Sequence, residues 1–167
     1  MSRLFVAVWP PDEVLEELRA LPRKDERGVR FVHPDSWHIT LRFLGDADPD
    51  QAEAALDTAT FPPAVVRLGP AVDVLAERAL VVPADGLDDT AAEVARCTAD
   101  IGERSRRRFN GHLTIARVKP YAHMPKALGA MVSAEFLLTE VALVQSRLDP
   151  AGARYETMAS WPVSRGG

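Results

Sequence analysis

Cysteine is almost absent from this chain of 167 residues, and long apolar runs are absent altogether. The single cysteine, Cys97, excludes an internal disulfide and a zinc site built from several cysteines. No apolar run approaches the roughly 20 residues that a membrane-spanning helix needs, so we expect no membrane partner. The apolar opening, residues 4–9, is short, ends at Pro10 and lacks a signal-peptide cleavage site. These absences predict a cytoplasmic protein.

An excess of positive charge is also lacking, since the net charge is −4, and this argues against a general binder of polyanions. Positive charge is nevertheless concentrated locally, in Arg104, Arg106, Arg107 and Arg108. A basic cluster on an acidic protein favours a small phosphate-bearing target over a long duplex, although such a run can also be a solvated turn. The length and the apolar fraction of 47% suit one domain over residues 1–167.

Strand-like and helix-like patterns alternate along the chain. The pattern predicts strands at residues 3–9, 29–32, 37–44, 65–75, 78–83, 112–118, 135–148 and 154–161, and helices at 12–21, 48–59, 87–104 and 125–132. Each half of the chain contains one strand with a polar face and helices nearby. This order predicts an α+β, bilobal fold with weak internal duplication and a cleft between the lobes.

The two polar strands carry the same His-x-Thr motif, one in each half of the chain. Residues i and i+2 of a strand share a face, so His38 lies beside Thr40 and His112 lies beside Thr114. The residues between them are aliphatic and point to the opposite face. Two strands that each present an imidazole beside a hydroxyl form a stronger signal than either motif alone.

Paired imidazoles suit the opening of a cyclic phosphate. Water must lose a proton as it attacks phosphorus, and the departing ribose oxygen must gain one. Histidine titrates near pH ~6.5, so one ring can be neutral while the other is charged. The threonine hydroxyls can donate to the non-bridging oxygens, and a nearby arginine can add a bidentate contact.

One arginine follows each motif within the same predicted strand. Strict alternation places Arg42 on the face of His38. The same rule places Arg117 on the face opposite His112. Arg117 shares the face of His112 only if the strand ends or bulges before it.

These residues resemble the two-histidine phosphoesterase superfamily, and in particular its RNA 2′,3′-cyclic phosphodiesterase branch, historically called the bacterial 2′-5′ RNA ligases. The resemblance is carried by both His-x-Thr motifs and by the flanking residues of the second. It extends to residues 3–8, 29–32, 143–148 and 152–155, and so covers nearly the whole chain.

The resemblance implies a bilobal fold in which two antiparallel sheets with outer helices surround a central cleft. It also implies hydrolysis of RNA 2′,3′-cyclic phosphate ends to 2′-phosphates, with no metal and no other cofactor. By position, His38 is expected to be the proton donor and His112 the proton acceptor, with Thr40, Thr114 and Arg117 binding the phosphate. The expected partners are RNA 3′ ends or nucleoside 2′,3′-cyclic phosphates, bound by a monomer.

Three alternatives stay open from the residues. The same fold could bind an RNA end or a nucleotide without turnover, using the histidines as hydrogen-bond donors. The histidines could instead be metal ligands, although neither motif supplies a carboxylate at matching spacing. A two-histidine enzyme could also act on another substrate, such as a cyclic ADP-ribose-like phosphate or a 2′-5′ linkage.

Overall fold

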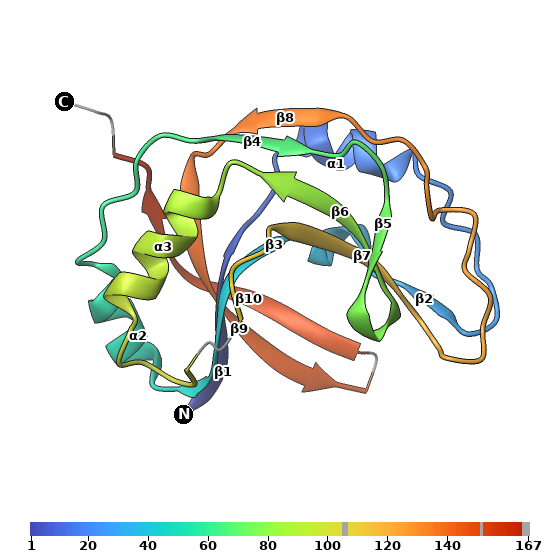
Figure 1. The fold of residues 1–167 in the computed structure, drawn as a ribbon. Helices are drawn as coiled ribbons and strands as arrows, with labels where there is room; N and C mark the ends of the chain where they lie inside the picture. Colours follow the sequence, from blue (N-terminus) through green and yellow to red (C-terminus); the bar gives the residue numbers. More distant parts are fainter. Residues whose placement is uncertain (105–106, 151, 165–167) are drawn as a thin grey trace.

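The strands of the protein form one long, curved antiparallel array with three helices packed on it (Figure 1). The structure is a computed structural model that describes residues 1–104, 107–150 and 152–164, apart from the side chain of residue 77. The strands are β1 (Ser2–Val8), β2 (Val29–Phe31), β3 (Ile39–Ala47), β4 (Val65–Leu68), β5 (Asp73–Leu75), β6 (Ala79–Asp85), β7 (His112–Val118), β8 (Ala134–Leu137), β9 (Glu140–Asp149) and β10 (Gly152–Pro162). The helices are α1 (Asp12–Arg19), α2 (Pro49–Leu56) and α3 (Asp88–Cys97).

The array consists of two groups of strands that meet at a narrow seam. One group has the order β10-β9-β1-β3, and the other has the order β7-β6-β4-β8, with β2 on β7 and β5 on β6. β3 joins β7 through a single pair, Ile39 with Leu113. The pairings within and between the groups are antiparallel. The predicted bilobal, antiparallel α+β architecture is therefore confirmed, and the two motif strands form its seam.

The two groups do not divide the chain at its midpoint. β9 and β10, near the end of the chain, return to the group that contains β1. β2, from the first half of the chain, pairs with β7 from the second half. The predicted hairpin around residues 149–152 is confirmed as the β9–β10 pair.

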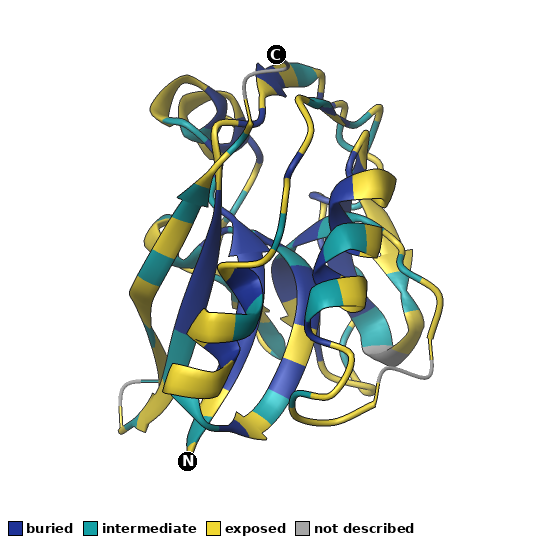
Figure 2. Cartoon of the chain, turned by 90° about the vertical axis from the view of Figure 1, so that its left-hand side faces the viewer, coloured by how far each residue is buried: buried dark blue, intermediate teal, exposed yellow. Residues whose placement is uncertain are grey.

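The helices bury their apolar residues against the strands in one hydrophobic core. α2 begins as predicted, with Asp48 capping the backbone N–H of Asp50 at 2.9 Å and Pro49 in the first turn. Its inward face carries the fully buried Ala52 and Leu56. Figure 2 shows the same arrangement, with dark blue strands in the middle and yellow outer helix surfaces.

Two predicted helices differ from the structure. α3 ends at Cys97, although the pattern extended to residue 104, and the chain then turns at Gly102 with φ +64°. A Cβ on Gly102 would lie 2.0 Å from the carbonyl oxygen of Leu44, so this turn needs glycine. Residues 125–132 form turns where a short helix was predicted. Within the described residues, none of the helices has the length and apolar character needed to span a membrane.

Candidate active site

The middle residues of the two His-x-Thr motifs are the ones that join β3 to β7. Because the strands run antiparallel, His38 falls opposite Thr114, and Thr40 falls opposite His112. The aliphatic residues between them are fully buried, so the four polar side chains share the other side of the seam. We call this side the motif face and the opposite side the core face. The structure thus brings both predicted motifs together on one face.

Each histidine ring is fixed by the backbone just before it. The Nδ1 of His38 donates to the carbonyl oxygen of Ser36 at 2.7 Å, and the Nδ1 of His112 donates to that of Asn110 at 2.7 Å. A carbonyl only accepts, so these contacts place a proton on Nδ1 and leave Nε2 as the nitrogen that can exchange one. The Nε2 of His38 lies 3.0 Å from the hydroxyl oxygen of Thr40.

Aromatic rings enclose His38. Its ring centroid lies 4.9 Å from that of Phe5, 5.6 Å from Trp9 and 5.3 Å from Tyr155. Burial lowers the pKa of His38, the carbonyl of Ser36 raises it by a smaller amount, and the charge of His112 lowers it further. The free protein therefore favours the neutral form of His38, and a bound phosphate anion would favour the charged form.

A β-bulge in β3 changes the predicted placement of Arg42. Thr40 pairs with Ala7 of β1, and Arg42 pairs with the next residue, Val6, so Leu41 is an extra residue in the ladder. Neighbouring residues of β1 point to opposite faces, which puts Thr40 on the motif face and Arg42 on the core face. The prediction that Arg42 shares the face of His38 is therefore wrong.

The guanidinium of Arg42 holds the segment that follows α3. Its Nη1 donates to the carbonyl and to the hydroxyl of Thr98, the latter at 2.5 Å. Its Nη2 donates to the carbonyl oxygens of Ile101 at 3.2 Å and Glu103 at 2.9 Å. Arg42 is 9% exposed and satisfies carbonyls left free where the helix ends, so its contacts do not support the predicted contact with phosphate.

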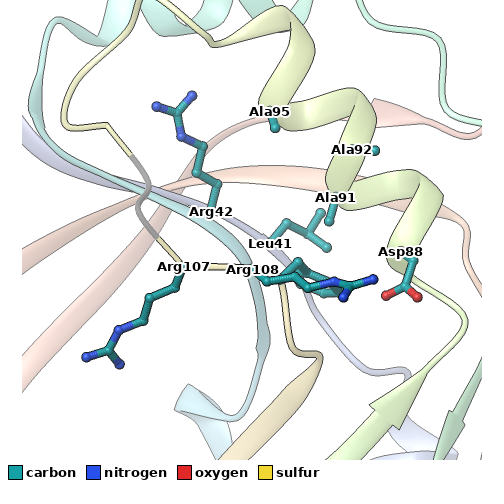
Figure 3. Close-up of a pocket in the computed structure, with 9 residues that line it drawn as sticks. Leu41, Arg42, Asp88, Ala91, Ala92, Ala95, Arg107 and Arg108 are labelled. Atoms are coloured by element: carbon teal, nitrogen blue, oxygen red, sulfur yellow. The ribbon is translucent and has the colours of Figure 1, made fainter.

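Two arginines of the basic cluster, Arg107 and Arg108, lie beside the core face. Arg107 and Arg108 line a pocket between β3 and α3 together with Arg42 and Leu41, and Figure 3 shows Arg108 pointing toward Asp88. This pocket lies across β3 from Thr40, because Leu41 and Arg42 face the core. Arg104 is exposed, and Arg106 lies outside the described residues.

A second bulge, in β7, brings Arg117 back to the motif face. Thr114 pairs with Val81 of β6, and Arg117 pairs with Ala79, so Ile115 is the extra residue. Val81 and Ala79 share one face of β6, and their partners therefore share it too. Arg117 lies on the face of His112 and Thr114, which resolves the conflict between strict alternation and a direct contact with phosphate.

The aromatic residues around His38 were missed as part of the site. Alternation within β1 was available as a signal, because Phe5, Ala7 and Trp9 all share the face of Thr40. Phe43 joins this face through the bulge, and its ring lies 5.8 Å from that of Phe5. Trp37, which directly precedes the first motif, is 1% exposed and packs in the core.

Comparison with known proteins agrees with this geometry. Residues 8–69 match the family described as LigT like Phosphoesterase. The chain is 26% identical to an RNA 2′,3′-cyclic phosphodiesterase of Methanocaldococcus jannaschii, over 95% of this chain and 99% of the relative. It is 29% identical to a protein of the same name from Archaeoglobus fulgidus, over 93% and 97%.

A solved structure shows the same fold. E. coli LigT complexed with 3′-AMP superposes with a TM-score of 0.81 at 23% identity, over 98% of this chain and 99% of that chain. The paired His-x-Thr strands, the matched family and these relatives agree with one another. The chain is thus similar to LigT-like phosphoesterases over residues 8–69, and to the two phosphodiesterases over nearly its whole length.

Proposed function

We propose that this protein hydrolyses the 2′,3′-cyclic phosphate at RNA ends to a 2′-phosphate by metal-independent acid–base catalysis. The observation that carries the proposal is the crossing of the two motifs at the seam, where two imidazoles and two hydroxyls share one face. The names of the two archaeal relatives support this substrate.

In the proposed reaction, Nε2 of His112 accepts a proton from water as the water oxygen bonds to phosphorus. The bond from phosphorus to the 3′ oxygen breaks, and His38 donates the proton that this oxygen takes up. The phosphate stays on the 2′ oxygen. Thr40 and Thr114 donate hydrogen bonds to the non-bridging oxygens, and Arg117 neutralises their charge.

In this scheme, binding of the substrate favours the protonated form of His38. Burial disfavours a charged His38 in the free protein, whereas the anionic phosphate favours it. Binding therefore raises the proton affinity of the group that must donate, and it does so only when a substrate is present. Both proton transfers are carried by imidazoles, so a metal ion is not needed for either.

The test is hydrolysis of a nucleoside 2′,3′-cyclic phosphate by single variants. His38→Ala and His112→Ala should each lower kcat/KM by about 10²–10⁴-fold, the range for a positioned acid or base. His33→Ala and His123→Ala are matched controls that remove histidines outside the motifs, and they should retain activity. A chelator should leave the wild-type rate unchanged, and the product should be the 2′-phosphate.

Other outcomes separate the alternatives. Full activity in either motif variant would refute the paired roles. Binding of the cyclic phosphate without any turnover would indicate a nucleotide binder on the same fold. Loss of activity with chelator, restored by a metal, would indicate metal chemistry.

A further inference from the structure

We propose that Arg30 and Lys119 extend the phosphate site into a path for the RNA backbone on the 5′ side of the terminal nucleotide, so that the preferred substrate is an oligonucleotide. The inference rests on the proposed function and adds a substrate-length preference to it. We call Arg30, Arg117 and Lys119 the basic strip.

The strip begins with two arginines in direct cross-strand register. Arg30 of β2 pairs with Arg117 of β7, so the two side chains emerge side by side on the motif face. Both are exposed. Like charges directly opposite each other destabilise a sheet, and an anion bound between them removes this repulsion.

Within the part of the chain that the structure describes, neither arginine forms an ion pair with a carboxylate. Ion pairs with carboxylates occupy five other arginines, namely Arg19, Arg67, Arg96, Arg147 and Arg154. Among the described residues, no such pair is found for Arg30, Arg117 or Lys119. Carboxylates outnumber cations in this chain, so the lack of a partner at three adjacent cations favours an external anion.

The strip leads away from the reacting phosphate. At about 3.3 Å per residue, Arg117 lies roughly 10 Å or less along β7 from Thr114, and Lys119 lies roughly 17 Å from it. Arg30, Arg117 and Lys119 line one hollow together with Tyr121, which is 70% exposed. Cations that follow a strand, with an exposed aromatic ring among them, are typical of single-stranded nucleic acid sites.

The side chain of Arg30 lies against the tip of the β9–β10 hairpin. A Cβ on Gly152 would lie 2.7 Å from Nη2 of Arg30, so the guanidinium passes directly over the glycine. The hairpin belongs to the strand group of His38, whereas Arg30 belongs to the group of His112. The basic strip therefore starts where the two strand groups approach each other at Arg30 and Gly152.

The experiment compares two substrates that end in the same group, adenosine 2′,3′-cyclic phosphate and a short oligoadenylate with a terminal 2′,3′-cyclic phosphate. For the wild type, kcat/KM should be higher for the oligonucleotide. The double variant Arg30→Ala/Lys119→Ala should lower the ratio of the two kcat/KM values about tenfold. Arg67→Ala removes one exposed arginine of β4 and should leave that ratio unchanged.

A binding measurement provides a readout that does not depend on turnover. A fluorescent oligoadenylate ending in a 2′-phosphate should bind the double variant about tenfold more weakly than the wild type. The slope of log affinity against log salt should fall by about 0.7 for each RNA phosphate that the variant no longer neutralises.

The outcomes distinguish this inference from the proposed function. Turnover of both substrates with an unchanged ratio in the double variant would overturn the basic strip and leave the phosphodiesterase intact. Turnover of neither substrate by the wild type would overturn the proposed function. In that case the oligoadenylate binding measurement would still test the basic strip. Equal affinity of the wild type and the double variant for the oligoadenylate would refute it.

Discussion

An imidazole acts as a defined acid or base only when its ring plane and its tautomer are both fixed. A carbonyl two residues earlier fixes both in each motif, through Ser36 for His38 and Asn110 for His112. The two sites differ in their surroundings, since aromatic rings enclose His38. When two identical titratable groups have different surroundings, their pKa values differ, and one can act as acid while the other acts as base.

The environment of His38 gives a prediction at this scale. Tyr155→Ala removes a ring 5.3 Å from the imidazole and admits water, so the lowered pKa of His38 should rise toward its ordinary value near ~6.5. NMR titration of the His38 ring protons measures this directly. The only other tyrosine, Tyr121, provides the matched control, and Tyr121→Ala should leave the pKa of His38 in place. An unmoved pKa in Tyr155→Ala would mean that this ring contributes nothing to the desolvation.

At the scale of elements, β-bulges decide which arginine lies on the motif face. The sequence correctly predicted the motif strands, a helix where α2 lies and the closing hairpin, because local patterns determine them. Strict alternation of side chains assigned the wrong face to Arg42 and to Arg117. In both strands one extra residue enters the β-ladder directly after the motif. A bulge depends on the partner strand, and the pattern of one strand does not contain that information.

The role of Arg42 can be tested by removing its guanidinium. Arg42→Met keeps the length of the side chain but leaves the carbonyls of Thr98, Ile101 and Glu103 without their donor. We expect the free energy of unfolding in urea to fall by about 1–3 kcal/mol, the cost of unsatisfied buried acceptors. The KM for a nucleoside 2′,3′-cyclic phosphate should stay within about twofold. A large rise in KM at unchanged stability would instead restore the phosphate role predicted from alternation.

At the scale of the whole molecule, the buried imidazole links stability to pH. The pKa of His38 is lowered in the folded protein, so below pH ~6.5 the unfolded chain binds this proton more tightly than the native chain. The stabilisation is present above ~6.5 and is lost as the pH falls toward the native pKa. Stability should therefore decrease between about pH 7.5 and pH 5.5.

Chemical denaturation at several pH values measures this dependence. His38→Gln removes the titrating group, so its stability should vary less with pH than that of the wild type over the same interval. His33→Gln removes a histidine whose side chain is 74% exposed and should keep the wild-type slope. Parallel slopes for wild type and His38→Gln would contradict the link.

The bulge at Ile115 has a consequence for how such enzymes can change. The extra residue, Ile115, reverses which face each later residue of β7 points to. A single-codon deletion there would point the Arg117 side chain into the hydrophobic interior and turn its aliphatic neighbours outward. The placement of Arg117 on the motif face thus depends on the length of β7 as much as on the identity of the residue. Deleting one residue from this strand would change the site more than most substitutions would.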